Sequence, residues 1–428
     1  MKKGILTFIL SIVTLLFLGC SSDKNEDEIE SNNSPNLNIS EETNVLDEIV
    51  TDTLVNRTKL FWLYLHHEEI PDALIQTEAP RRDLVVMNAW FQEYVPKFKS
   101  INPEIKTLVY KDLTSTRSYA VENGEDNEYL LPTGVGFAYA DTNYPEWFLV
   151  DENDNRLEYT GYANHWQMDI GNTTYQQYWA NQVGNELVVN EWDGVLMDNA
   201  IYKRDTYHEN IYPANYDNDE DFQLAYEAML SVINTRLHQD NKIGLANITD
   251  TRLHPGVWDS YLQQLNGALN EWWLVFGNGN YLSDYPQGFM PQITEVAGNE
   301  AKNKITLVQP HTSIIDNQGF YYAFASYWLV NNGNTYFSEQ EITDDYNDPS
   351  PWRDEYNWNF GEAIGNYSQL ENGLYKREFT RALVFVNASE TASIQIDLDT
   401  TYLNEVGEEV DTIVLNALSG TVLRTLNE

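Results

Sequence analysis

The sequence predicts an α/β protein, a (β/α)8 TIM barrel followed by a small C-terminal all-β domain. Three observations predict this fold. Short apolar runs of strand length recur along the chain, amphipathic segments with a helical period separate them, and from Leu374 the pattern changes to alternating β-type runs. A chain of 428 residues has room for one domain of about 250 to 300 residues and a smaller second one.

The first 20 residues resemble a bacterial lipoprotein signal. Two lysines are followed by an apolar run over residues 5–18, which is shorter than the ~20 residues that span a bilayer. Gly19 then precedes Cys20, the single cysteine of the chain. We expect cleavage before Cys20, which would carry the lipid, and no intramolecular disulfide, because the sequence has no second cysteine.

Residues 21–56 are expected to form a disordered tether, because they are rich in Ser, Asn, Asp and Glu and hold too few apolar residues to pack a core. The acidic stretch directly after Cys20, SSDKNEDEIE, resembles the export signal of surface lipoproteins in some Gram-negative bacteria. A solvated linker would have the same composition. The expected location is the outer membrane, facing the cell surface, with membrane contact only through the lipid.

Residues 57–370 carry the pattern of the barrel. The predicted strands are residues 60–65, 83–88, 106–110, 194–199, 243–248, 267–272, 305–309 and 334–337. Helical patterns at residues 174–190, 221–239 and 292–302 lie between strands, with apolar residues three or four apart. This continuous alternation favours a closed barrel of parallel strands.

Two long connections and a terminal β-segment complete the organisation. Residues 112–166 are too many for an ordinary strand-to-helix connection and predict an elaborated active-site loop. Residues 341–371, which carry Trp352 and Trp358, are expected to cap the barrel mouth. Residues 371–428 read as alternating strands and turns and predict a small β-sandwich-like domain.

Composition narrows the class of ligand. Asp and Glu number 66 against 25 Lys and Arg, so the net charge of −41 disfavours nucleic acid and anionic lipid surfaces. Aromatic residues make up 13% of the chain, and many lie in loop-like stretches, where flat rings suit stacking on sugars.

Asp198 is the first candidate catalytic residue. It ends the run Gly194 to Asp198, and in a TIM barrel functional groups project from the C-terminal ends of the strands. An acid at that place is costly unless it is used or paired, although a loop carboxylate or helix cap is the alternative. Asp193, in the same stretch, fits a structural turn, because Asp-Gly favours turns.

Glu271 is the second candidate, at the end of a short apolar run and next to Trp272 and Trp273. Neighbouring indoles would keep the carboxyl dry and raise its pKa, as a general acid requires, and the alternative is an ion-paired rim residue. Asp198 and Glu271 end the fourth and sixth predicted strands, so their backbones would lie about 10 Å apart. Carboxyls about 5 to 5.5 Å apart would imply a retaining mechanism and a wider gap inversion, and the sequence leaves this open.

Five stretches, HWQMDIGN, TTYQQYWANQV, EWDGVLMDNA, LNGALNEWW and YKREFTRALVFVNAS, together resemble glycoside hydrolases of the hypothetical family 15 type. The resemblance covers most of the chain after the tether, and more distantly the chain looks like endo-dextranase and polygalactosaminidase barrels. It implies a carbohydrate substrate, with Asp198 as nucleophile and Glu271 as general acid/base of a retaining enzyme.

Further candidates for substrate binding are residues that can hydrogen-bond to hydroxyls or stack on sugar rings. They are Tyr64, Asn88, Tyr110, Trp166, Asp169, Asn199, Asn247, Trp272, Gln309 and His311. Each has an alternative as a packed or capping residue. For Asp169, which precedes a polar helix start, capping and substrate binding are equally expected.

The sequence lacks the motifs that are typical of metal, serine-nucleophile, phosphate-binding and dinucleotide-binding sites. The dense cluster of residues 66–69 places neighbouring side chains on opposite faces of a strand, and no HExxH, GxSxG, P-loop or GxGxxG motif is present. We therefore expect no metal, no cofactor and a monomer. The alternative from another class is a non-catalytic surface lipoprotein that binds glycans, because a fold alone does not imply catalysis.

Overall fold

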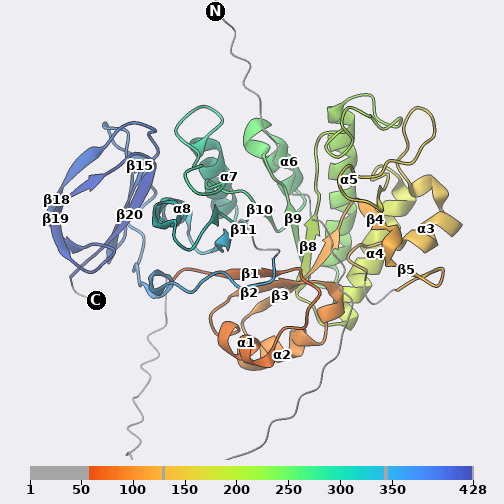
Figure 1. Ribbon diagram of the computed structural model, residues 1–428, viewed down its shortest axis with the longest axis horizontal. Coiled ribbons are helices and arrows are strands. Elements are labelled where there is room, and N and C mark those ends of the chain that lie inside the picture. Colours follow the sequence, from red (N-terminus) through yellow and green to blue (C-terminus); the bar gives the residue numbers. More distant parts are fainter. Residues whose placement is uncertain (1–56, 128–130, 342–345, 427–428) are drawn as a thin grey trace, which may run out of the picture. The chain divides into compact units, whose positions relative to one another are not determined.

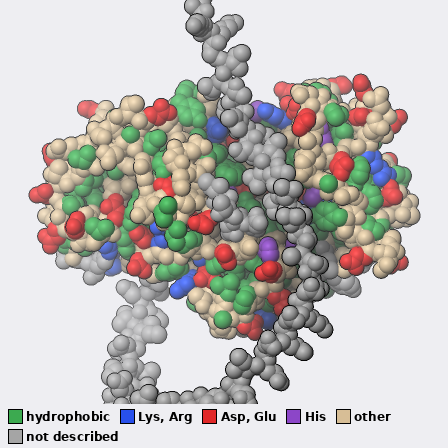
Figure 2. Space-filling model, viewed as in Figure 1, with side chains coloured by type: hydrophobic (Ala, Val, Ile, Leu, Met, Phe, Trp, Pro, Cys, Tyr) green, Lys and Arg blue, Asp and Glu red, His purple; other side chains and the backbone are tan. Residues whose placement is uncertain are grey.

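The computed structural model describes residues 57–426, except 128–130 and 342–345. Cys20, the predicted signal and the predicted tether lie outside the described residues. Within the described part, no helix is long and apolar enough to cross a membrane. Acidic side chains are scattered over the visible face, in keeping with the net charge of −41 (Figure 2).

Eight parallel strands form the barrel. They are β1 (Phe61–Tyr64), β2 (Leu84–Met87), β3 (Lys106–Asp112), β8 (Gly194–Asp198), β9 (Ile243–Asn247), β10 (Gly267–Asn270), β11 (Ile305–Val308) and β13 (Thr335–Phe337). They neighbour one another in that order. Seven of the eight predicted runs contain a whole strand, and the eighth strand, β3, extends two residues beyond the predicted run 106–110. A bridge between Leu60 and Phe337 joins the last strand to the first, and Phe337 N donates to Lys59 O (2.8 Å). The predicted fold class is confirmed.

Helices surround the strands (Figure 1). They are α1 (Asp72–Glu78), α2 (Tyr94–Ile101), α4 (Thr173–Val189), α5 (Asp219–His238), α6 (Val257–Leu262), α7 (Phe289–Ala301) and α8 (Asn317–Val330). Three begin at a residue whose side chain accepts backbone hydrogen bonds of the first turn: Asn172 for α4, Asn218 for α5 and Asp316 for α8.

Strand side chains alternate between the inside of the barrel and the layer under the helices. The inside cluster includes Leu63, Leu108, Leu196, Leu245 and Leu269. Residues two positions further along these strands therefore also point inward, now at the C-terminal mouth. This alternation decides which strand-end residues reach the mouth.

The long connection after β3 has secondary structure of its own. In it β4 (Ser115–Arg117) pairs antiparallel with β7 (His165–Gln167), and β5 (Val121–Glu122) pairs with β6 (Glu125–Asp126) ahead of α3 (Phe137–Asn143). The connection after β3 is therefore a structured insertion in the barrel.

The C-terminal strands form one six-stranded antiparallel sheet. Its members are β15 (Ser368–Gln369), β16 (Tyr375–Glu378), β17 (Ala382–Asn387), β18 (Ile394–Leu403), β19 (Glu409–Leu415) and β20 (Ser419–Arg424). One face packs on α8, where a Cβ on Gly420 would lie 2.5 Å from Tyr321 O and 2.6 Å from Ala325 Cβ (Figure 1). The other face holds a second, smaller apolar cluster around Leu383 and Phe385.

Candidate active site

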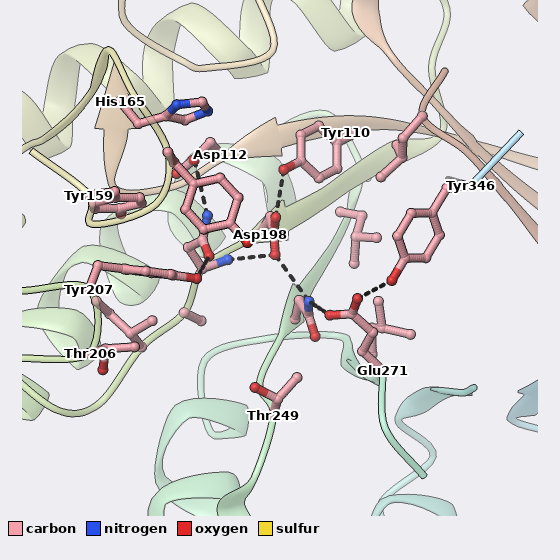
Figure 3. A pocket seen from close by; sticks show the side chains of 18 of the residues that line it. Tyr110, Asp112, Tyr159, His165, Asp198, Thr206, Tyr207, Thr249, Glu271 and Tyr346 are labelled. Carbon is pink, nitrogen blue, oxygen red and sulfur yellow. Dashed lines mark hydrogen bonds between the residues drawn. The ribbon is translucent and has the colours of Figure 1, made fainter. Parts of the chain in front are cut away.

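A pocket of about 360 Å³ lies at the C-terminal ends of the barrel strands (Figure 3). Leu63, Leu196 and Leu269, which belong to the inside cluster of the barrel, line it. Asp198 and Glu271, the two predicted carboxylates, both line this pocket. The same inward alternation of strand side chains that builds the barrel interior thus brings both acids to one cavity.

Asp198 is the last residue of β8 and is held by three hydrogen-bond donors. Tyr110 OH donates to Oδ2 (2.5 Å), and Asn247 Nδ2 (3.0 Å) and Asn199 N (2.8 Å) donate to Oδ1. Burial and the nearby charge of Asp112 raise the pKa of Asp198, whereas the three donors act in the opposite direction. The donors are arranged to hold the ionised carboxylate.

Glu271 directly follows β10 and has two donors. Asn247 Nδ2 donates to Oε2 (2.8 Å), and Tyr346 OH donates to Oε1. Burial raises the pKa of Glu271, the charge of Asp198 raises it further, and the two hydrogen bonds lower it. Glu271 is therefore placed to carry a proton at a higher pH than an exposed glutamate.

Asn247 joins the two acids, because its Nδ2 is the donor to both. Asn247 ends β9, the strand between β8 and β10, so its amide lies between the two carboxylates that it contacts. The two oxygens that share this nitrogen are therefore less than about 6 Å apart, near the spacing of carboxyl pairs in retaining glycosidases.

Asp112 is a third carboxylate in the pocket that the sequence analysis did not select. It ends β3 opposite Asp198 in the strand register and is 1% exposed. It accepts hydrogen bonds from Ser115 Oγ (2.6 Å) and Asn199 Nδ2 (3.0 Å) and lies 3.7 Å from Arg117. Asp112 thus anchors the start of the long connection and holds Asn199 beside Asp198.

Aromatic side chains from two loops form one side of the pocket. Tyr159, from the long connection, stacks on Tyr207 with ring centroids 4.1 Å apart, and Tyr207 OH donates to Asn199 Oδ1 (2.6 Å). His165 also lines the pocket, and its pKa is lowered by burial and by the charge of Arg117. As expected from its length and composition, the 112–166 connection contributes side chains to this cavity.

Three of the predicted binding residues line the pocket with the acids, namely Tyr110, Asn199 and Asn247. Asn88 lies in the wall of a neighbouring pocket and donates to Leu65 O (2.8 Å). The other predicted binding residues do not line the pocket of Asp198 and Glu271.

Tyr64 and Trp272 point away from the pocket, because each is one position out of step with the inward residues of its strand. Tyr64 packs with Trp62 and Phe91 in the layer outside the barrel. Trp272 stacks on His311 with centroids 3.5 Å apart. Neither Trp272 nor Trp273 lines the pocket of Glu271.

Gln309 is fully buried and donates to Gln340, and His311 is 3% exposed and donates to Glu271 O (2.8 Å). Burial lowers the pKa of His311 to about 4, so its ring is neutral. Asp169 accepts from Tyr216 OH (2.6 Å) and does not cap the following helix, which Asn172 caps.

Trp166 donates to Ser118 Oγ (2.9 Å) and packs near Phe137, whereas its neighbour His165 reaches the pocket. Within residues 57–426, outside the two omitted segments, no group of three His, Cys, Asp or Glu side chains is arranged to hold a metal ion.

Residues 99–383 match the model of the family described as hypothetical glycosyl hydrolase family 15. The structure is similar to that of a maltogenic alpha-amylase from Thermotoga neapolitana, with 11% sequence identity and a TM-score of 0.50. The alignment covers 86% of this chain and 99% of the amylase chain. A second similar structure is a family 27 β-L-arabinopyranosidase from Geobacillus stearothermophilus, with 8% identity and a TM-score of 0.49. That alignment covers 86% of this chain and 97% of the arabinopyranosidase chain. No curated protein matches the sequence. At these identities, the likeness to solved structures shows the barrel fold alone.

Proposed function

Because the chain belongs to hypothetical glycosyl hydrolase family 15, we propose that it is a retaining glycoside hydrolase of poly- or oligosaccharides, with Asp198 as nucleophile and Glu271 as general acid/base. The observation that carries this proposal is the single Asn247 amide that donates to both acids. It supports a separation that leaves room for a glycosidic bond between the carboxylates but not for an inverting water.

The hydrogen bonds support the division of roles. Asp198 has three donors, which stabilise an anion, and Glu271 has two together with the repulsion of the Asp198 charge. Two carboxylates this close disfavour simultaneous ionisation, so the pair holds one proton, and the carboxylate with more hydrogen-bond donors is the anion and nucleophile. We therefore assign the proton to Glu271 in the resting enzyme.

The reaction follows in two steps. Glu271 donates its proton to the glycosidic oxygen as the Asp198 oxygen bonds to the anomeric carbon, and the alcohol leaves. Glu271, now ionised, then takes a proton from a water molecule that attacks the same carbon, and the ester bond to Asp198 breaks. The negative charge on Asp198 is lost in the first step and returns in the second. The hydrogen bond from Tyr110 OH stabilises that charge before the first step and after the second.

A panel of neutral and acidic polysaccharides tests the proposed function. The protein from residue 57 onward is incubated with each glycan, and released reducing ends and binding are measured in parallel. Release of reducing ends that disappears in Asp198→Asn supports the hydrolase. Binding without release on every glycan would instead support a non-catalytic glycan-binding protein.

The pH profile tests the role of Glu271. Activity requires ionised Asp198 and protonated Glu271, so the alkaline limb follows the raised pKa of Glu271. Tyr346→Phe removes a hydrogen bond that lowers this pKa, so Glu271 keeps its proton to higher pH. We expect the alkaline limb of kcat/KM to move up by about one pH unit, since a hydrogen bond to a charged group is worth about 1.5 kcal/mol or more. A limb that stays in place or moves down would contradict this assignment.

We also propose that the protein is anchored to the outer membrane through a lipid on Cys20 and faces the cell surface. The basic start, the short apolar run and the Gly19-Cys20 pair support this proposal. Metabolic labelling with an alkyne fatty acid should tag the wild-type chain and not Cys20→Ser. Equal labelling of both chains, or of neither, would refute the anchor.

A further inference from the structure

A second pocket, of about 470 Å³, lies beside the catalytic pocket. The two pockets share Leu65, Tyr110 and Arg117 in their walls. Tyr110 is the residue whose hydroxyl donates to Asp198, so the second pocket begins one side chain away from the nucleophile. A ligand longer than one sugar can therefore extend from one pocket into the other.

The second pocket presents flat rings and a few polar groups, the usual lining of a site for a small organic ligand. Trp90, which follows β2, stacks on His67 with centroids 5.0 Å apart, and Tyr119 is 53% exposed. Asn88 contributes an amide to the same wall. Exposed ring faces with nearby hydrogen-bonding groups suit the apolar face and the hydroxyls of a pyranose.

Arg117 stands in the wall that the pockets share and has an unused donor. Its guanidinium donates to Tyr119 OH (3.1 Å) and lies 3.7 Å from Asp112. Its Nε is buried and has no hydrogen-bond partner among the described residues. The Arg117 side chain is 15% exposed and lines both pockets, so the exposed part of its guanidinium can donate to a ligand oxygen where the pockets meet.

The position of the second pocket relative to Glu271 gives the direction of the substrate. Side chains at the ends of β1, β2 and β3 and in the loop after β3 line it, whereas Glu271 follows β10 and lines only the first pocket. The general acid must contact the leaving-group oxygen, so the leaving group lies on the Glu271 side. A sugar in the second pocket therefore belongs to the part of the chain that becomes bonded to Asp198.

We propose that the second pocket is a sugar subsite for the unit next to the cleaved one, on the non-reducing side of the scissile bond. This inference rests on the proposed function. The substrate is then a glycan chain that places at least two sugars on that side, and the smallest product released from the non-reducing end is a disaccharide.

The experiment uses an oligosaccharide ladder of two to eight units, fluorescently labelled at the reducing end, made by partial hydrolysis of the polysaccharide that the wild-type protein cleaves. Trp90→Ala and Tyr119→Ala are compared with Tyr285→Ala, an exposed tyrosine outside both pockets. We expect each subsite variant to raise KM about tenfold or more, the loss of about one aromatic contact, and Tyr285→Ala to match the wild type. Thermal melting of each variant checks the fold.

The outcomes separate this inference from the proposed function. Wild-type cleavage that releases no unlabelled monosaccharide from the non-reducing end, with raised KM in both subsite variants, supports the subsite. Wild-type KM in folded Trp90→Ala and Tyr119→Ala, or an unlabelled monosaccharide released from the non-reducing end as the first product, overturns the subsite and leaves the hydrolase standing. A wild-type protein that cleaves no glycan overturns both.

Discussion

Asp198→Asn is expected to lower kcat at least about 10⁴-fold on any glycan that the wild-type protein cleaves, because an amide does not form the covalent intermediate. The fold should not suffer. The pKa of Asp198 is raised in the folded protein, by burial and by Asp112, so its ionised form is less favourable folded than unfolded. At neutral pH the uncharged asparagine is therefore expected to leave the melting temperature unchanged or higher.

Asp193→Asn is the matched control, because Asp193 directly precedes the first residue of β8, whereas Asp198 is its last residue. There it binds Lys99 (2.8 Å) and accepts from Thr107 N (2.8 Å), far from the chemistry. We expect Asp193→Asn to lower stability and to keep kcat within a factor of a few of the wild type. A folded Asp198→Asn that keeps turnover within a factor of a few of the wild type would remove Asp198 from the nucleophile role.

Glu271→Ala is expected to lose about 10²-fold to 10⁴-fold in kcat/KM on natural glycans, the usual contribution of a general acid. The loss should depend on the leaving group. A dinitrophenolate leaves without a proton, so the first step on the dinitrophenyl glycoside of the same sugar should be nearly as fast as in the wild type.

The second step still needs a base, so Glu271→Ala should accumulate the covalent intermediate on that activated substrate. A burst of dinitrophenolate followed by a slow steady rate, measured by stopped flow, would report this. Added azide needs no base and should restore turnover as a glycosyl azide. Equal losses on both leaving groups and no burst would mean that Glu271 does not move the proton.

Much of the barrel follows from the sequence, because strand-length apolar runs alternate with helical segments. The alternation of side chains within a strand also predicts which residues at the strand ends point into the barrel mouth. Asp198 and Glu271 each stand two residues after an inward leucine, and so do Tyr110 and Asn247. A second two-residue step along β3, from Tyr110, selects Asp112, and the same spacing excludes Tyr64 and Trp272.

The rest of the site comes from loop residues. No local sequence pattern predicts which loop side chains contact the residues at the strand ends. Tyr346 reaches Glu271 from a segment after β13, and Tyr207 reaches Asn199 from a segment after β8. Helix α8 was also not among the predicted helices. It is buried by the barrel on one side and by the C-terminal sheet on the other, so its sequence is apolar all round and lacks an amphipathic period.

The bridge between Leu60 and Phe337 also governs when activity can arise during synthesis. A nascent chain that ends before β13 already contains Asp198, Asn247 and Glu271, but β1 and β11 still have open edges. Such edges are sites of intermolecular pairing, and the contact that removes them is among the most distant in sequence. Tyr346, which donates to Glu271, emerges later still, so the site is completed only after the strand that closes the barrel has been made, with the C-terminal sheet still to follow.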